Sequence, residues 1–187
     1  MAKKPSYLGM LNAIANGERG GHELFKAWSG ATKDKALRAT LKTIALRELE
    51  HSVAFEKRIS ELGFELRAPS DVAASKVLAK QIRLLDSSAS DMKKFATFGI
   101  GIKTRDLSES KQVKTKNVKG KKAEKKAQRG VAETNAVDPL LQVLADPTID
   151  PQTGALMGRF ICEERDTGRM LRAAYKKVVK KAARNAG

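Results

Sequence analysis

A chain of 187 residues, 41% apolar and only 5% aromatic, is long enough for one domain, spanning 1–187, with a full hydrophobic core. Its 37 Lys and Arg against 21 Asp and Glu give a formal net charge of +16, which favours either a solvated basic surface or contact with nucleic acid. The single cysteine excludes an internal disulfide, and no apolar run approaches the about eighteen residues of a membrane span, so we expect a cytoplasmic protein without membrane contact.

The first predicted helix runs from a cap at Ser6 to a C-terminal glycine at Gly30. Apolar residues recur along it at helical spacing, and Glu18 stands midway on this otherwise apolar face. Glycine destabilises a helix interior by up to about 1 kcal/mol relative to alanine, yet three glycines surround this carboxylate. They indicate either the close approach of another group or a local kink: Gly17, Gly20 and Gly21.

The second predicted helix begins with a cap between Thr32 and Asp34 and closes at Gly63, after a short link that makes it antiparallel to the first. Steps of three and four residues place eight positions on one side, and six of these eight are apolar. Glu48 and His51 stand in the middle of this stripe, three residues apart. That spacing is typical of carboxylate-bridged metal sites inside helical bundles.

The third predicted helix begins at Ser70 or Asp71 and ends near Gly99, with a regular apolar stripe that contains no glutamate. Asp86 and Asp91 are its only interior acids. The eight residues before it span at most about 27 Å when fully extended. Either this helix begins late or the topology is a simple up-and-down arrangement without a long crossover.

A basic segment, 100–136, follows as a predicted flexible insertion between the third and fourth helices. Residues 103–129 carry eleven Lys or Arg against three acids, with little apolar content. Two interpretations stay open, a solvated linker and an arm that contacts the phosphates of nucleic acid. The candidate nucleic-acid contacts are Lys114, Lys116, Lys119, Lys121, Lys122, Lys125 and Lys126.

The last predicted helix starts at Asp150-Pro151, with the aspartate as cap and the proline in the first turn. Two registers compete on it. The apolar stripe favours Glu164 as the inward carboxylate, four residues after an inward apolar position. The other register pairs Glu163 with Asp166 and places Arg159 on the core side.

Three of the four long helices therefore carry a glutamate in mid-stripe, Glu18, Glu48 and Glu164, and one adds His51. Burying an ionised carboxylate among aliphatic side chains costs several kcal/mol unless a cation compensates it. Carboxylates with one imidazole point first to iron or manganese. The alternative is a metal-free interior, in which protonation or the neighbouring Arg47 and Arg165 neutralise the acids.

These residues resemble the ferritin-like superfamily in its rubrerythrin and di-iron carboxylate branch. The resemblance lies in Gly17-Glu18, in the run 47–55 around Glu48 and His51, and in 161–171 around Glu164. It implies an all-α ferritin-like four-helix bundle with Glu18 as terminal ligand, Glu48 as bridging ligand and His51 as its partner. It also implies oxidoreductase activity or the handling of iron or peroxide.

The chain departs from the family pattern at two places. A second Glu-x-x-His is missing from the last helix and a glutamate from the third, so one metal, two metals or none are compatible with the sequence. Without a Cys-x-x-Cys pair, electrons would come from an external donor. A homo-oligomer and a basic nucleic-acid-associated bundle with a degenerate site also stay open. Further candidate ligands are Asp86, Asp91, Glu163 and Asp166.

Overall fold

The computed structural model describes residues 4–69, 72–101, 144 and 146–184. Within these residues all regular structure is helical, so the predicted all-α class is confirmed for the part that the structure describes. The predicted insertion 100–136, apart from residues 100 and 101, lies outside the described residues. The helices are α1 (Leu8–Ala31), α2 (Lys35–Glu61), α3 (Val72–Asp86), α4 (Asp91–Ala96) and α7 (Pro151–Arg184).

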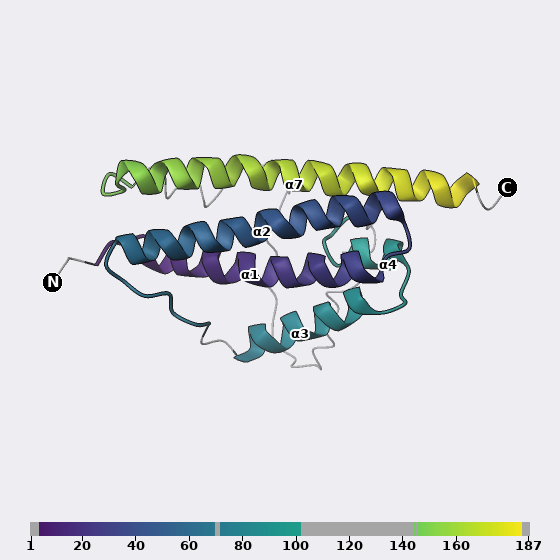
Figure 1. Cartoon of the computed structure of the whole chain (residues 1–187), viewed down its shortest axis with the longest axis horizontal. Helices are drawn as coiled ribbons and strands as arrows, with labels where there is room; N and C mark the ends of the chain where they lie inside the picture. Colours follow the sequence, from purple (N-terminus) through teal and green to yellow (C-terminus); the bar gives the residue numbers. More distant parts are fainter. Residues whose placement is uncertain (1–3, 70–71, 102–143, 145, 185–187) are drawn as a thin grey trace, which may run out of the picture.

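The antiparallel pair α1 and α2 forms the centre of the molecule, with α7 packed along α2 and α3 along α1 (Figure 1). The chain runs in the same direction in α1, α3 and α7 and in the opposite direction in α2. The 34 residues of α7 make a rod about 51 Å long, which spans the whole α1–α2 pair. Short α4 lies near the α1–α2 turn and contacts the second half of α7.

The predicted helix ends agree with the structure at α2 and disagree at α1. Asp34 caps α2, because its Oδ1 accepts hydrogen bonds from the backbone N–H groups of Ala36 and Leu37. Gly63 follows the end of α2 with a φ of +83°, a value that favours glycine. The predicted cap at Ser6 is wrong: α1 begins one residue after Tyr7, and the Ser6 hydroxyl instead donates to Asp146 at 2.6 Å.

The single third helix predicted from residue 70 to residue 99 is also wrong. It is broken into α3 and α4 at the serines that separate Asp86 from Asp91. The hydroxyl of Ser87 donates back to the carbonyl of Leu84 at 2.6 Å, and the hydroxyl of Ser90 accepts from the N–H of Lys93 to cap α4. Serine hydroxyls that bond to nearby backbone in this way compete with helix continuation.

The connection from α2 to α3 is short, and α3 runs antiparallel to α2. Of the two topologies left open by the sequence, this is the one without a long crossover at this point. The start of α7, however, lies at the end of the molecule opposite α4 (Figure 1). None of the described helices carries an apolar stretch long enough to cross a bilayer.

The core consists of two apolar clusters that follow each other along the helices. One cluster joins the start of α1, the end of α2 and the start of α7, and includes Leu11, Phe55 and Phe160. The other joins the end of α1, the start of α2, α4 and the second half of α7, and includes Trp28 and Leu41. The residues between these clusters in all three long helices are the predicted polar ones, which are therefore enclosed by apolar side chains on both sides.

Candidate metal centre

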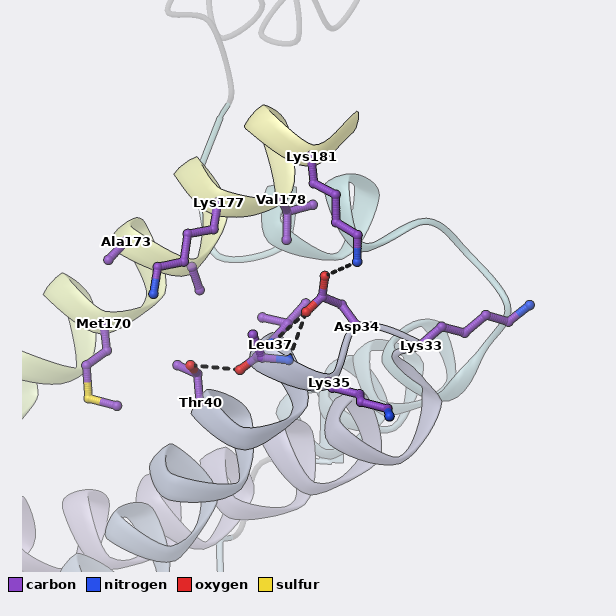
Figure 2. Close-up of a pocket in the computed structure, with 12 residues that line it drawn as sticks. Lys33, Asp34, Lys35, Leu37, Thr40, Met170, Ala173, Lys177, Val178 and Lys181 are labelled. Atoms are coloured by element: carbon purple, nitrogen blue, oxygen red, sulfur yellow. Dashed lines mark hydrogen bonds and ion pairs between the residues drawn. The ribbon is translucent and has the colours of Figure 1, made fainter. Parts of the chain in front are cut away.

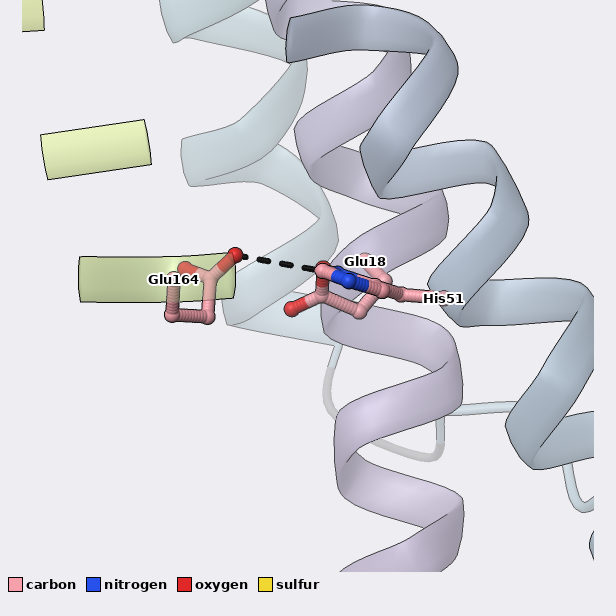
Figure 3. A group of neighbouring side chains, drawn as sticks. All are labelled: Glu18, His51 and Glu164. Carbon is pink, nitrogen blue, oxygen red and sulfur yellow. Dashed lines mark hydrogen bonds and ion pairs between the residues drawn. The ribbon is translucent and has the colours of Figure 1, made fainter. Parts of the chain in front are cut away.

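Side chains from three helices converge between the two apolar clusters. Glu18 comes from the middle of α1, His51 from α2 and Glu164 from α7, and they point toward one another (Figure 3). One ligand atom from each lies within 4.8 Å of the others. These three residues form, with Glu48, a group that we call the carboxylate centre. The structure thus brings together three of the four residues that the stripes predict as metal ligands, and Glu48 adjoins them through a hydrogen bond with Glu18.

His51 is the hub of the carboxylate centre, and its side chain is only 4% exposed. Its Nδ1 lies 3.1 Å from Oε2 of Glu18, and its Nε2 lies 2.6 Å from Oε2 of Glu163. The ring edge of Phe160 packs against the imidazole at 5.0 Å between centroids. Burial lowers the pKa of His51, but the bonds to Glu18 and Glu163 outweigh it and raise this pKa above its usual range.

Glu48 lies against the backbone of α1 at Gly21. A Cβ atom at Gly21 would stand 2.3 Å from Oε2 of Glu48, so only glycine leaves room for this carboxyl group. Of the two explanations that the glycines left open, close approach applies at this position. Burial, followed by the nearby charges of Glu18 and Glu164, raises the pKa of Glu48 to about 9. Without a cation, Glu48 is therefore protonated at neutral pH.

Glu164 contributes an oxygen that has no hydrogen-bond partner among the residues that the structure describes. Its Oε1 is buried and lies 3.7 Å from Nδ1 of His51, too far for a hydrogen bond. Burial and the charge of Glu18 raise the pKa of Glu164. A buried and unpaired carboxylate oxygen is rare in proteins and needs a partner such as an ion or an ordered water.

The two registers predicted for α7 are both used, but on opposite sides of the imidazole. Glu164 faces Nδ1 of His51, and Glu163 binds Nε2. Arg159, which the second register placed on the core side, is instead exposed and donates to Oε1 of Glu163 at 2.9 Å. Burial raises the pKa of Glu163, but the bonds to His51 and Arg159 reverse this and lower it overall. Glu163 is therefore ionised.

Arg47 lies beside the carboxylate centre but forms its hydrogen bonds with residues outside it. Its guanidinium donates to the carboxylate of Asp166 at 3.1 Å, to the hydroxyl of Thr167 and to the carbonyl of Glu163. None of these hydrogen bonds reaches Glu18, Glu48 or Glu164, although the charge of Arg47 lowers the pKa values of Glu48 and Glu164 slightly. Arg165, the other proposed neutralising residue, is exposed.

Several candidate residues lie outside the carboxylate centre. Asp86 is exposed, and Asp91 accepts hydrogen bonds from the indole of Trp28 and the hydroxyl of Thr32, at the far end of α1. Asp166 pairs with Arg47 and Arg169 rather than with His51. The seven candidate nucleic-acid lysines lie outside the described residues: Lys114, Lys116, Lys119, Lys121, Lys122, Lys125 and Lys126.

The donor set fits one hard or intermediate divalent cation. Three carboxylates and one imidazole are the ligands that iron and manganese take in helical bundles. The orphaned oxygen of Glu164 and the raised pKa of Glu48 both mark an excess of negative charge that a cation would offset. With neither a second histidine nor an acid of α3 or α4 in the described group, the residues present suffice for one ion.

Sequence reasoning assigned Glu163 only as a competing ligand and missed its role in orienting His51. The adjacent glutamates Glu163 and Glu164 could have indicated this arrangement, because two neighbouring carboxylates can lie on either side of one imidazole. Comparison with family models, curated proteins and solved structures finds no match. A function for this chain is therefore inferred from the geometry of the carboxylate centre.

Proposed function

We propose that this protein is a ferritin-like metal-binding protein that holds one iron or manganese ion in the carboxylate centre. Glu18, His51 and Glu164 would supply three ligands, and Glu48 the fourth. The observation that carries the proposal is the convergence of the ligand atoms of Glu18, His51 and Glu164 within 4.8 Å of one another. One of these residues, Glu164, has a buried oxygen without a hydrogen-bond partner among the described residues. Such a group is expected where a cation replaces the missing positive charge.

The charges of the carboxylate centre favour a cation over a purely structural role. The buried Glu18 and Glu48 and the half-buried Glu164 share a single imidazole, and the guanidinium of Arg47 is hydrogen-bonded elsewhere. The protein alone can relieve this repulsion only by taking up protons, as the raised pKa of Glu48 indicates. A divalent ion would release those protons and let each carboxylate act as a ligand.

Glu163 prepares His51 for this role. As an ionised carboxylate 2.6 Å from Nε2, it favours the tautomer with the proton on Nε2 and the lone pair on Nδ1. Nδ1 is the nitrogen that faces Glu18 and Glu164. A carboxylate, a histidine and a metal in this order are the usual arrangement of protein metal sites, in which the outer carboxylate orients the ring and raises its basicity.

An apolar groove of about 500 Å³ reaches His51 from the outer side of α2 and α7. Its walls include Leu49, Val53 and Phe160, and most of its lining is apolar. A bound iron or manganese ion would supply the redox chemistry, with electrons from an external donor. The protein would supply orientation and exclude bulk water through the two apolar clusters.

Elemental analysis of the purified protein tests the proposal. The protein is freed of metal with a chelator, loaded with Fe²⁺ without air or with Mn²⁺, and passed through a desalting column. We expect about one ion per chain in the unaltered protein and little in His51→Gln and Glu164→Gln, which keep side-chain size. Glu50→Gln is the matched control, because Glu50 is an exposed carboxylate on the same helix as His51.

Circular dichroism shows that each variant is folded. Equal metal content in the His51→Gln variant and the Glu50→Gln control would contradict the proposal. So would loss of metal from both, because it would place the binding on the protein surface. The expected result also separates iron or manganese from the metal-free alternative.

A further inference from the structure

A second hollow, separate from the carboxylate centre, lies where the start of α2 meets the second half of α7. Its volume is about 730 Å³, and Figure 2 shows the side chains that border it. Lysines come from both sides, Lys33 and Lys35 from the α1–α2 turn and the start of α2, and Lys177 and Lys181 from α7. The floor is apolar and made mostly of small residues: Leu37, Met170, Ala173, Ala174 and Val178. We call this hollow the lysine groove.

Positive charge is concentrated around the lysine groove. The part of α7 that borders it, 169–184, carries seven Lys or Arg and no acid, whereas 151–168 carries two Arg and three acids. The facing segment, 33–42, carries four Lys or Arg and one acid. Part of the +16 excess of the whole chain therefore lies on the two segments that border the lysine groove.

The one acid in the lysine groove is already engaged. Asp34 accepts from the backbone N–H groups of Ala36 and Leu37 through Oδ1 and from Nζ of Lys181 at 2.9 Å through Oδ2. Lys33, Lys35 and Lys177 form no ion pair with any described residue. Lys33, Lys35 and Lys177 thus border one hollow without a counter-charge among the described residues, with the amino ends of Lys33 and Lys35 directed away from α7 (Figure 2). Such an arrangement attracts an extended anion.

We propose that the lysine groove binds the phosphate backbone of double-helical nucleic acid, without regard to base sequence. The basic stretch of α7 is about 22 Å long, which matches about six phosphates along one strand of a duplex. No aromatic side chain in the described part is exposed, so no platform for stacking unpaired bases is found there. This favours a duplex over a single strand.

The same face is a poor match for a membrane surface. A helix that lies on a bilayer needs large apolar side chains beside its basic ones. On the second half of α7, Val179 is the one large apolar side chain described as exposed. Ala173 of the floor is exposed, but the larger apolar side chains of Leu37, Met170 and Val178 are buried or half-buried. An anionic vesicle serves as a competing probe in the test.

The proposal is independent of the metal. Lys177 lies thirteen positions after Glu164, which corresponds to about 20 Å along α7. Loss of the metal and loss of nucleic-acid binding are therefore measured by different variants. Neither result bears on the other.

Fluorescence anisotropy with a labelled 20-base-pair duplex of mixed sequence tests the lysine groove. The full chain is titrated at salt concentrations from 0.05 to 0.2 M. The test variant is Lys33→Gln/Lys35→Gln/Lys177→Gln, which leaves the Asp34–Lys181 ion pair intact. The control carries the same loss of charge on exposed lysines away from the groove: Lys57→Gln/Lys76→Gln/Lys80→Gln.

We expect the test variant to bind the duplex about 100-fold more weakly than the unaltered chain at 0.1 M salt. The slope of log K against log salt concentration should decrease in magnitude by about 2.7. The control should stay within about threefold of the unaltered chain. A single strand of equal length should bind more weakly than the duplex. Equal loss in both variants would overturn the proposal, because net charge alone would then explain binding. Duplex binding that is unchanged in the test variant, while binding to phosphatidylserine vesicles is lost, would also overturn it.

Discussion

Two of the polar clusters in the described part of the chain compensate their buried charges in opposite ways. One is the carboxylate centre. The other surrounds Arg58, at the end of α2, where it meets the starts of α1 and α7. Both join the three long helices, and both lie next to the same apolar cluster. They differ in whether their charges and hydrogen bonds are complete without a ligand.

We call the Arg58 cluster closed, because protein groups satisfy its charges and hydrogen bonds. Its guanidinium pairs with Oδ1 of Asp150 at 2.8 Å, donates to the hydroxyl of Thr153 at 2.8 Å and bonds to Glu61 and Gln152. The second oxygen of Asp150 accepts from Thr153 and from the hydroxyl of Tyr7. Burial raises the pKa of Asp150, but these bonds outweigh it and hold this pKa well below its usual range. Such a cluster stabilises the contacts between the helix ends without a bound ligand.

We call the carboxylate centre open, because the described protein groups leave part of its charge and hydrogen bonding unsatisfied. It has more acids than bases, a buried oxygen without a hydrogen-bond partner, and raised pKa values at Glu48 and Glu164. The contrast suggests a general rule: among buried charges, an unbalanced group marks a ligand site and a balanced group marks a structural joint.

The largest effect concerns the pH dependence of stability in the metal-free protein. In the unfolded chain Glu48 ionises near its ordinary pKa of 4.5, whereas in the folded protein its pKa is about 9. The folded state thus binds one more proton between these values, so the free energy of unfolding falls as pH rises, by at most about 1.4 kcal/mol per pH unit. Between pH 5 and pH 8 this reaches about 4 kcal/mol.

Glu48→Gln removes this group, because glutamine does not ionise. With chelator present, we expect the stability of the Glu48→Gln variant, measured by urea unfolding, to fall less between pH 5 and pH 8 than that of the unaltered protein. Glu50→Gln, on the exposed side of α2, should keep the original dependence. Parallel pH profiles in the unaltered protein and the Glu48→Gln variant would show that Glu48 is not held protonated in the folded state.

Helix periodicity and caps made much of this architecture predictable. The mid-stripe positions of Glu18, Glu48 and Glu164 follow from residue spacing alone, because residues three and four apart share a helix face. Asp34 and Gly63 mark the ends of α2 by local chemistry that does not depend on the rest of the fold. Both kinds of signal lie within one helix.

What could not be predicted depends on contacts between helices. The apolar stripe of the third helix continues across Ser87–Ser90, yet the chain breaks there, and Asp91 binds Trp28 and Thr32 instead of joining the carboxylate centre. The choice between Glu163 and Glu164 assumed one inward carboxylate. His51 presents two nitrogens on opposite sides of its ring, so both glutamates face it. A single helix stripe does not contain that information.

The closed cluster should be sensitive to removal of its cation. In Arg58→Met the apolar stem is kept, but Asp150 and Glu61 lose their partner, so we expect about 3 kcal/mol less stability at pH 7 by urea unfolding. Arg159→Met removes an exposed guanidinium from the neighbouring helix and should change stability by less than about 1 kcal/mol. A loss at Arg58 no larger than the loss at Arg159 would mean that the cluster does not join the helices.

The open cluster should gain stability from a cation that the closed cluster does not bind. At a free Mn²⁺ concentration 100 times its dissociation constant, we expect about 2.7 kcal/mol of added stability, because the ion binds only the folded chain. The gain, measured by thermal unfolding with and without chelator, should vanish in His51→Gln. It should persist in Arg58→Met, whose lower starting stability is a separate effect. Equal gains in all three proteins would place the ion outside the carboxylate centre.

The smallest effect separates orientation of His51 from ligation. Glu163→Gln keeps side-chain size but weakens the bond that holds the proton on Nε2, so we expect about tenfold lower metal affinity, near 1.4 kcal/mol. Asp166→Asn, three residues further along α7, removes a carboxylate that pairs with Arg47 and Arg169 but does not contact His51. Mn²⁺ affinity by isothermal titration should therefore be nearly unchanged in Asp166→Asn. If Glu163 were a ligand rather than an orienting group, its loss would match that of Glu164→Gln, and the open cluster would extend to both sides of the imidazole.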